Sequence, residues 1–352
     1  MNRCVRHSHL LGVDTSSGRT FDHRKQWLED GIASLAKCFA IDVLSYAILS
    51  NHFHIVLRNR PDVVATWSDT EVAQRWLRIC PLRKSKDGSP AEPTEAELNT
   101  IRNVPERLEE IRLRLSDISW MMKKLTEPIA RRSNLEDEIS GHFWQGRFRG
   151  VKLCDEASIL ACMAYVDLNP IRAGLACSLS ASHYTAVKRR LRDLEEFTGM
   201  APPVESLDEG EEPGALPPGN SASPANWIAP LSLEEATTAP GPQANRTGTR
   251  CSDKGILPMS LEDYLQLVQW TGQQAVAKKP AAMPEPLAVI VARVGIGSSG
   301  EWLAWSRGFD ELFSLLAGRP ETIERQRQRR GNRPRSSPRQ RHLSASGGSG
   351  SA

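Results

Sequence analysis

Residues 46–57 read YAILSNHFHIVL, an apolar run that holds two histidines two positions apart. Side chains alternate between the two faces of a strand, so His52 and His54 share one face while Phe53 and Ile55 take the other. Two imidazoles side by side on one sheet face suit a divalent metal ion. The alternative is a pair of half-exposed strand histidines that bind nothing, because imidazole is common in both settings.

The composition is that of an ordinary globular protein. The chain has 352 residues, 39% of them hydrophobic and 25% charged, which predicts two or three domains with a sizeable core. No run approaches the roughly 20 apolar residues of a membrane span. The net charge of +3 permits a nucleic-acid partner without demanding one.

The cysteines and the N-terminus point to the cytoplasm. Seven cysteines are scattered along the chain and never spaced as Cys-x-x-Cys, which favours reduced thiols over a disulfide framework or a zinc ribbon. The first residues, MNRCVR, contain no apolar stretch of the kind found in signal peptides. We therefore expect a cytoplasmic protein without a membrane partner.

Shifts in composition divide the chain into four parts. Residues 1–199 are densely patterned and form the expected catalytic domain, with an insertion at about 60–104. Residues 200–255 are rich in Pro, Gly and acidic residues and predict a disordered linker. Residues 256–318 predict a small helical accessory domain. Residues 319–352 predict a disordered, arginine-rich tail, which either holds phosphates or is simply solvated.

Local patterns place the elements of the first part. Charged and apolar residues alternate at helical spacing over 23–40, which predicts a helix there. Within the insertion, Thr94 followed by Glu97 fits a capping box. Apolar residues that step by three and four from residue 105 to residue 125 predict one long amphipathic helix. A strand is expected at about 151–153.

A second group of polar residues lies on a helix predicted at 156–168. Tyr165 and Asn169 are four positions apart, so they share one flank with the small residues Ser158 and Ala161. A tyrosine on such a flank either reaches into a cleft or lies at the boundary of the core with its hydroxyl in water. The helix by itself favours the second arrangement.

Three motifs together resemble a known family. The sequence SNHFH at 50–54 resembles the HUH motif of single-tyrosine transposases. The sequences GHFWQGRF at 141–148 and YVDLNPIRAGL at 165–175 are similar to those of its REP-associated tyrosine transposase branch. The resemblance covers about residues 3–192, with the motifs in the family's order. The family's first strand normally starts a few residues earlier, so we expect either that the true start lies before Met1 or that the edge strand is short.

The resemblance implies a fold and a chemistry. The fold would be α+β, a ferredoxin-like HUH domain with an antiparallel sheet. His52 and His54 would be metal ligands with Asn169 as the third, for Mg²⁺ or Mn²⁺, and Tyr165 would be the nucleophile. The protein would cleave and rejoin single-stranded DNA at hairpin or palindromic repeats through a 5′-phosphotyrosine intermediate. It would act in the cytoplasm, associated with the nucleoid, as a monomer or homodimer.

Basic and aromatic residues around the second and third motifs are candidates for binding this DNA. Arginines and lysines contact phosphates, and an indole can stack on an unpaired base. The alternative is that the indole belongs to the core and the cations to a solvated edge. The candidates are Trp144, Arg147, Arg149, Lys152 and Arg172.

A rival hypothesis comes from another class of protein. A domesticated descendant could bind DNA or RNA hairpins without cutting them. Such a protein would need neither the complete pair of histidines nor the tyrosine. Because all three are present, the sequence favours the enzyme.

Overall fold

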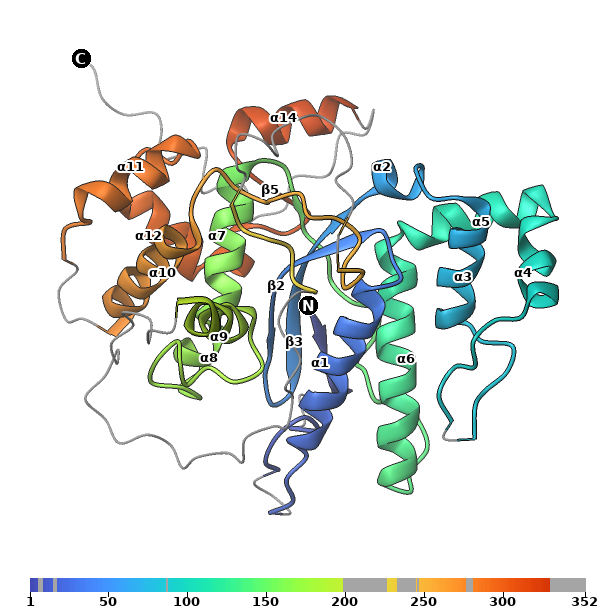
Figure 1. Ribbon diagram of the computed structural model, residues 1–352. Helices are drawn as coiled ribbons and strands as arrows, with labels where there is room; N and C mark the ends of the chain where they lie inside the picture. Colours follow the sequence, from blue (N-terminus) through green and yellow to red (C-terminus); the bar gives the residue numbers. More distant parts are fainter. Residues whose placement is uncertain are drawn as a thin grey trace. The chain divides into compact units, whose positions relative to one another are not determined.

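The computed structural model describes most of the chain, in two compact units (Figure 1). The described residues are 1–5, 9–14, 18–86, 88–198, 227–232, 245, 247–276 and 281–329. The first unit draws its residues from 1–148, 184–200 and 216–258, and the second from 149–183, 201–215 and 259–352. The structure is mixed α+β and mostly helical, as the fold class predicts at this coarse level.

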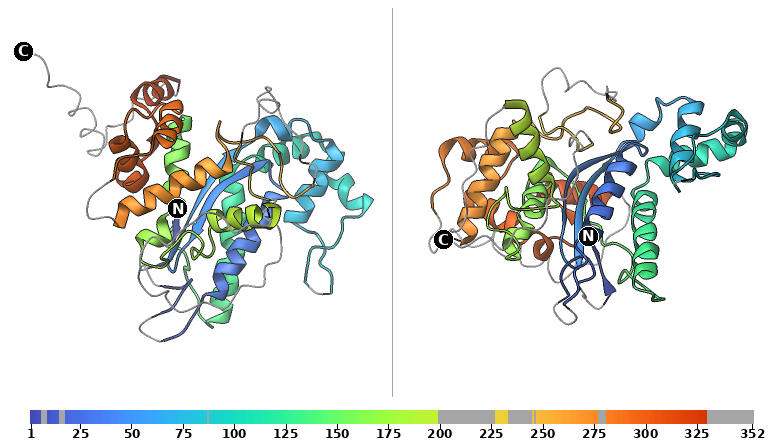
Figure 2. Two further views of the ribbon diagram at one scale, coloured as in Figure 1. Left: turned by 60° about the vertical axis from the view of Figure 1, so that its left-hand side comes forward. Right: turned by 60° about the horizontal axis from the view of Figure 1, so that its bottom comes forward.

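A three-stranded antiparallel sheet organises the first unit. The strands β1 (Asn2–Arg3), β2 (Ile41–Ile48) and β3 (His52–Asn59) pair in the order β1-β3-β2. Ser50 and Asn51 turn the chain between β2 and β3, closed by a 2.8 Å hydrogen bond from the Leu49 amide to the His52 carbonyl. Figure 2 shows the two long strands as a twisted ribbon. The edge strand β1 has only two residues.

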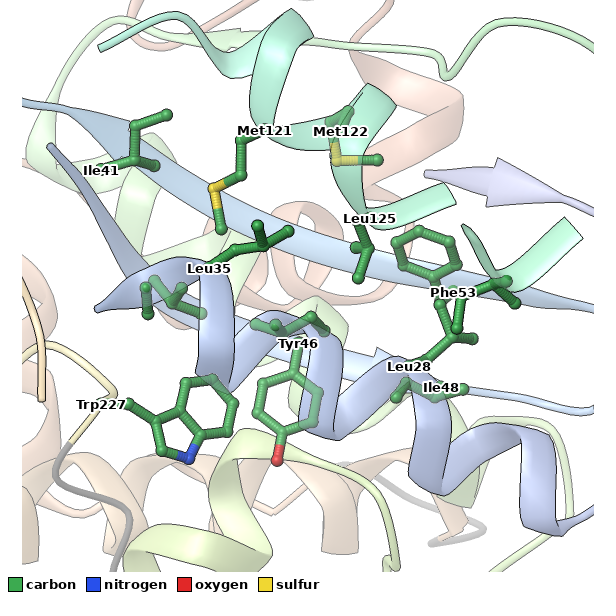
Figure 3. Packing of buried hydrophobic residues seen from close by; sticks show 14 of the residues in the cluster. Leu28, Leu35, Ile41, Tyr46, Ile48, Phe53, Met121, Met122, Leu125 and Trp227 are labelled. Carbon is green, nitrogen blue, oxygen red and sulfur yellow. The ribbon is translucent and has the colours of Figure 1, made fainter. Parts of the chain in front are cut away.

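Two helices bury one face of this sheet, α1 (His23–Ala36) and α6 (Ile118–Glu136). Phe53 lies in the resulting core, and Ile55 and Leu57 pack against it, so the predicted facing of this strand is confirmed. Figure 3 shows this packing, in which the labelled side chains are Leu28, Leu35, Ile41, Tyr46, Ile48, Phe53, Met121, Met122, Leu125 and Trp227.

The predicted insertion at about 60–104 and the helix that follows it form a helical subdomain with its own core. Its helices are α2 (Pro61–Val64), α3 (Asp69–Ile79), α4 (Glu95–Arg102) and α5 (Pro105–Leu115). The buried cluster that joins them contains Val64, Val72, Trp76, Leu98, Ile101, Ile111 and Leu115. The capping box predicted at Thr94 and Glu97 is present at the start of α4.

The prediction of one long helix from residue 105 is wrong. The chain breaks after Leu115, and Asp117 starts α6 by accepting hydrogen bonds from the amides of Ser119 and Trp120. Aspartate at this position satisfies amides that the first turn of a helix leaves without partners. The apolar spacing continues across the break, which is why periodicity alone did not reveal it.

Part of the predicted linker is packed structure. The Trp227 ring stacks on Tyr46 at 5.3 Å between centroids, and the Ala229 amide bonds to the Val43 carbonyl. Further on, Arg58 donates to the carbonyls of Lys254 and Gly255. The linker prediction for 200–255 is therefore wrong over 227–232 and 247–255. Each of these short segments supplies one large side chain or a few backbone groups. The average composition of residues 200–255 does not reveal such single contacts. The helix α9 (Ala186–Thr198), which precedes the linker, packs on β2.

The second unit combines the third motif with the C-terminal block. Its elements are β4 (Lys152–Leu153), α7 (Glu156–Asp167), α8 (Asn169–Arg172), α10 (Leu261–Val276), α11 (Glu285–Arg293), α12 (Ser299–Arg307), α13 (Phe309–Leu312), β5 (Leu316–Ala317) and α14 (Pro320–Arg329). The strand predicted at 151–153 exists as β4, but it pairs in parallel with β5 and does not join the antiparallel sheet.

Two domain predictions change as a result. The block at 256–318 is helical as expected, but α12 and α13 pack directly on α7, so it shares a unit with the third motif. Within the tail at 319–352, residues 320–329 form α14, and residues 330–352 lie outside the described residues. Across the described ranges, no helix combines the length and apolar character needed to cross a membrane.

Candidate active-site residues

The two histidines of the first motif lie side by side at the start of β3. Their ring centroids are 5.0 Å apart, with the rings nearly perpendicular. His52 is half-buried and His54 is buried. Their neighbours across the sheet, Arg3 and Ala47, come from the two flanking strands. The strand alternation therefore places two imidazole rings next to each other on the face away from Phe53.

Asn51 orients the first of these rings. Its Oδ1 lies 2.6 Å from Nδ1 of His52, and because an amide oxygen can only accept, Nδ1 carries the proton. The lone pair of this imidazole is then on Nε2, the nitrogen that would bind a metal. A partner on the second nitrogen is the usual way in which a protein fixes a histidine ligand. Asn51 also lies in the turn between β2 and β3, so it both turns the chain and contacts the His52 ring.

The donor set fits a divalent ion in part. Two neighbouring imidazoles, one held in the ligating tautomer, are suitable ligands for Mn²⁺ and acceptable for Mg²⁺. In the parts of the chain that the structure describes, no cluster of three or more His, Cys, Asp or Glu residues could hold a metal. The remaining ligands would have to be of another kind, such as an amide oxygen, water or a phosphate.

Tyr165, Asn169 and Arg172 form a row along one side of the α7–α8 segment. The break between the two helices is slight: Leu168 keeps a helical conformation, and the Arg172 amide bonds to its carbonyl. Residues spaced by four and seven therefore lie one above another. The Arg172 guanidinium carbon stands 3.8 Å from the centre of the Tyr165 ring. The spacing could have predicted this contact from the sequence.

The flank that carries Tyr165 is buried in the structure. Tyr165 exposes only 6% of its surface, and both Ser158 and Ala161 expose none. The Phe309 ring, at the start of α13, lies 6.0 Å from the ring of Tyr165. The expectation that this flank is open to a cleft or to water is therefore wrong. Residues about 140 positions further along the chain cover it, and no pattern within the helix could reveal that.

The surroundings of Tyr165 favour its neutral form. Burial raises the pKa of the phenol to about 12; the Arg172 charge opposes this rise, and the Asp310 carboxylate adds to it. Asp310 and Arg172 both make hydrogen bonds to the Tyr165 side chain. In this arrangement the hydroxyl is a weak nucleophile at neutral pH.

Four hydrogen bonds hold the C-terminal block against α7 and α8. At the start of α7, Asp155 accepts hydrogen bonds from the Arg319 amide and the Thr322 hydroxyl, at 2.7 and 2.6 Å. Near its end, Asp167 accepts one from Tyr264. In α8, Nη1 of Arg172 donates to the Arg307 carbonyl at 2.5 Å. The contacts are spread along the whole α7–α8 segment.

The predicted DNA-binding residues fall into two groups. Trp144 and Arg147 belong to the first unit, and Arg149, Lys152 and Arg172 to the second. Arg147, Arg149 and Lys152 are exposed, as a phosphate contact requires. Lys152 also donates to Gln326 of α14.

Trp144 is mainly a packing residue in the structure. Its indole N–H donates to the Thr126 carbonyl at 2.9 Å, and its ring makes edge contacts with Phe53 and Phe143. These contacts occupy the indole N–H and pack the ring against two aromatic side chains. The alternative in which the indole belongs to the core is the one that the structure favours.

Comparison of the chain with models of protein families, with curated proteins and with solved structures found no match. Sequence reasoning missed Arg307, Phe309 and Asp310, which lie in a region without any motif.

Proposed function

We propose that this protein is a transposase-like nuclease and strand transferase that acts on single-stranded DNA at hairpin or palindromic repeats. The observation that carries the proposal is the pair His52 and His54, adjacent on one sheet face, with Asn51 orienting the first ring. Tyr165, in a row with an amide and an arginine, adds support. The resemblance of three motifs to REP-associated tyrosine transposases links these features.

The proposal includes a ferredoxin-like HUH fold for the first unit. The order β1-α1-β2-β3-α6 supplies five of the six elements of that fold. The segment around Trp144 is our candidate for the sixth: it pairs antiparallel with Cys4, and its neighbours Phe143 and Gln145 bond to the backbone of Val5 and Arg3.

The proposed reaction exchanges one phosphodiester for another. The Tyr165 oxygen attacks phosphorus and loses its proton, the bond to the 3′ oxygen breaks, and that oxygen takes up a proton. The products are a 5′-phosphotyrosine and a free 3′-hydroxyl, which can react in reverse to rejoin strands. A divalent ion on His52 and His54, with Asn169 as the proposed third ligand, would polarise the phosphate.

A phenol has an ordinary pKa of about 10, so Tyr165 needs help to lose its proton. Arg172, stacked on its ring, is the residue that favours the phenolate. It is therefore proposed both to contact DNA and to support the nucleophile. Exposed Arg147, Arg149 and Lys152 are proposed to bind the phosphates of the strand on either side.

The experiment that tests this function is covalent capture. The full chain is incubated with Mn²⁺ or Mg²⁺ and a labelled hairpin oligonucleotide, denatured, and examined for label that migrates with protein. Tyr165→Phe should abolish the adduct, while Tyr184→Phe, a change at a half-buried tyrosine of the first unit, should leave it intact. An adduct that survives in Tyr165→Phe would assign the nucleophile elsewhere.

A second candidate function is hairpin binding without cleavage. The burial of Tyr165 beneath Phe309 favours it, because a nucleophile must meet its substrate. Under this alternative, the wild-type chain binds the hairpin in a gel-shift assay and yields no adduct with either metal.

A further inference from the structure

The turn between α12 and α13 places three residues around Tyr165. The Arg307 carbonyl accepts a hydrogen bond from Arg172, whose guanidinium stacks on the Tyr165 ring. Two residues later, Phe309 packs beside that ring. Next to Phe309, Asp310 hydrogen-bonds with the tyrosine side chain. The short segment 307–310 thus contacts the Tyr165 ring, the Arg172 side chain stacked on that ring and the polar group of the tyrosine.

The same region holds buried guanidinium donors that lack acceptors. Nε of Arg172, together with Nε and Nη2 of Arg307, is buried and has no hydrogen-bond partner in the described structure. Neither of these arginines forms an ion pair with a carboxylate among the described residues. A buried N–H donor without an acceptor is costly, and phosphate oxygens are the acceptors that match guanidinium donors best. Arg172, which stacks on Tyr165, thus keeps one buried donor without an acceptor, and Arg307 keeps two.

Asp310 is a negatively charged residue of the chain that contacts Tyr165, the candidate nucleophile. A carboxylate and a phosphodiester each carry one negative charge and present two oxygens to donors. In the proposed reaction, phosphorus must come within bonding distance of the Tyr165 hydroxyl. A side chain that hydrogen-bonds to Tyr165 competes with the phosphate for this place.

We propose that Asp310 is a built-in mimic of the scissile phosphate, and that Arg172 and Arg307 supply the donors of an anion site, which DNA phosphate enters when the Asp310 side chain leaves Tyr165. The proposal rests on the function of Tyr165 as nucleophile. It makes the C-terminal block a cover that keeps the DNA-free protein inactive.

The first test is a gain of activity in the full chain. Asp310→Asn removes the charge and keeps the shape, so the initial rate of adduct formation should rise by about tenfold, the rate factor for loss of a charged hydrogen bond. Glu311→Gln, the same change one residue along, should leave the rate at the wild-type value. Equal rates for Asp310→Asn and wild type would overturn the proposal.

A second measurement does not depend on activity. Acetylation of Tyr165 by N-acetylimidazole, followed by mass spectrometry of the DNA-free proteins, reports whether the hydroxyl is covered. Asp310→Asn should be acetylated several times faster than wild type or Glu311→Gln, and unchanged acetylation would overturn the cover. If Asp310→Asn is acetylated faster but none of the proteins forms an adduct, the α12–α13 turn covers Tyr165 and Tyr165 is not the nucleophile.

The anion site has its own control. In the Asp310→Asn background, inorganic phosphate should raise the melting temperature, and adding Arg307→Gln should reduce that shift by at least half. Arg325→Gln, at an exposed position of α14, should leave it unchanged. A phosphate effect that is insensitive to Arg307→Gln would remove Arg307 from the site.

Discussion

The Tyr264 hydroxyl donates a hydrogen bond of 2.5 Å to Oδ2 of Asp167, and both side chains are fully buried. This contact joins α10 of the C-terminal block to the last residue of the helix that carries Tyr165. A buried carboxylate is costly without a donor, so α7 depends on α10 for its stability in this unit. The block is therefore part of the structure around the candidate nucleophile.

Tyr264→Phe should destabilise the second unit. The change leaves the Asp167 carboxylate buried without this donor, at a cost of about 2–3 kcal/mol. Urea unfolding followed by tryptophan fluorescence measures the loss. The double variant Tyr264→Phe with Asp167→Leu should recover part of it, because the buried charge is then gone. A single variant as stable as wild type would show that Asp167 finds another donor.

His52→Ala and His54→Ala should each lower the rate of adduct formation by at least about a hundredfold, since loss of a metal ligand removes charge stabilisation at the phosphate. Hairpin binding measured by gel shift should change little. His9→Ala, at an exposed histidine near the N-terminus, is the matched control. Rates like those of wild type in both variants would place the metal elsewhere, and EDTA should stop the reaction in either case.

Tyr165 should make stability depend on alkaline pH. Burial raises its pKa from 10.0 to about 12, so the folded state favours the protonated phenol. The resulting stabilisation is complete below pH 10 and is lost as the pH rises towards 12. Between pH 9 and pH 11 the stability advantage of wild type over Tyr165→Phe should shrink by about 1 kcal/mol. Urea unfolding at both pH values measures this difference, and a constant difference would contradict it.

Truncation should not release a working catalytic domain. Composition alone suggests that a chain ending near Leu194 keeps its chemistry, with protease cleavage first within 201–254. The structure predicts otherwise, because the shortened chain loses the partners of Asp155, Asp167 and Arg172. We expect a lower melting temperature and no adduct from it. Limited proteolysis should spare the packed residues next to Trp227. A truncated chain that melts like the full chain would refute the dependence of α7 on the block.

The sequence by itself determined the structural features that depend on residues close together in the chain. Strand alternation put His52 and His54 on one face and Phe53 on the other, and a capping box marked the start of α4. Helical spacing put Tyr165 above Asn169. Each of these follows from backbone periods and from short-range hydrogen bonds, which a single sequence displays directly.

Only the tertiary structure decided what covers these residues. That β4 pairs with β5, that Trp227 packs on Tyr46 and that Asp310 meets Tyr165 all join segments more than a hundred residues apart. Such contacts depend on how buried faces and buried charges of distant segments satisfy one another, and no local period encodes that choice. For the same reason, the helix alone suggested that the Tyr165 hydroxyl is exposed, whereas Tyr165 is buried in the folded chain.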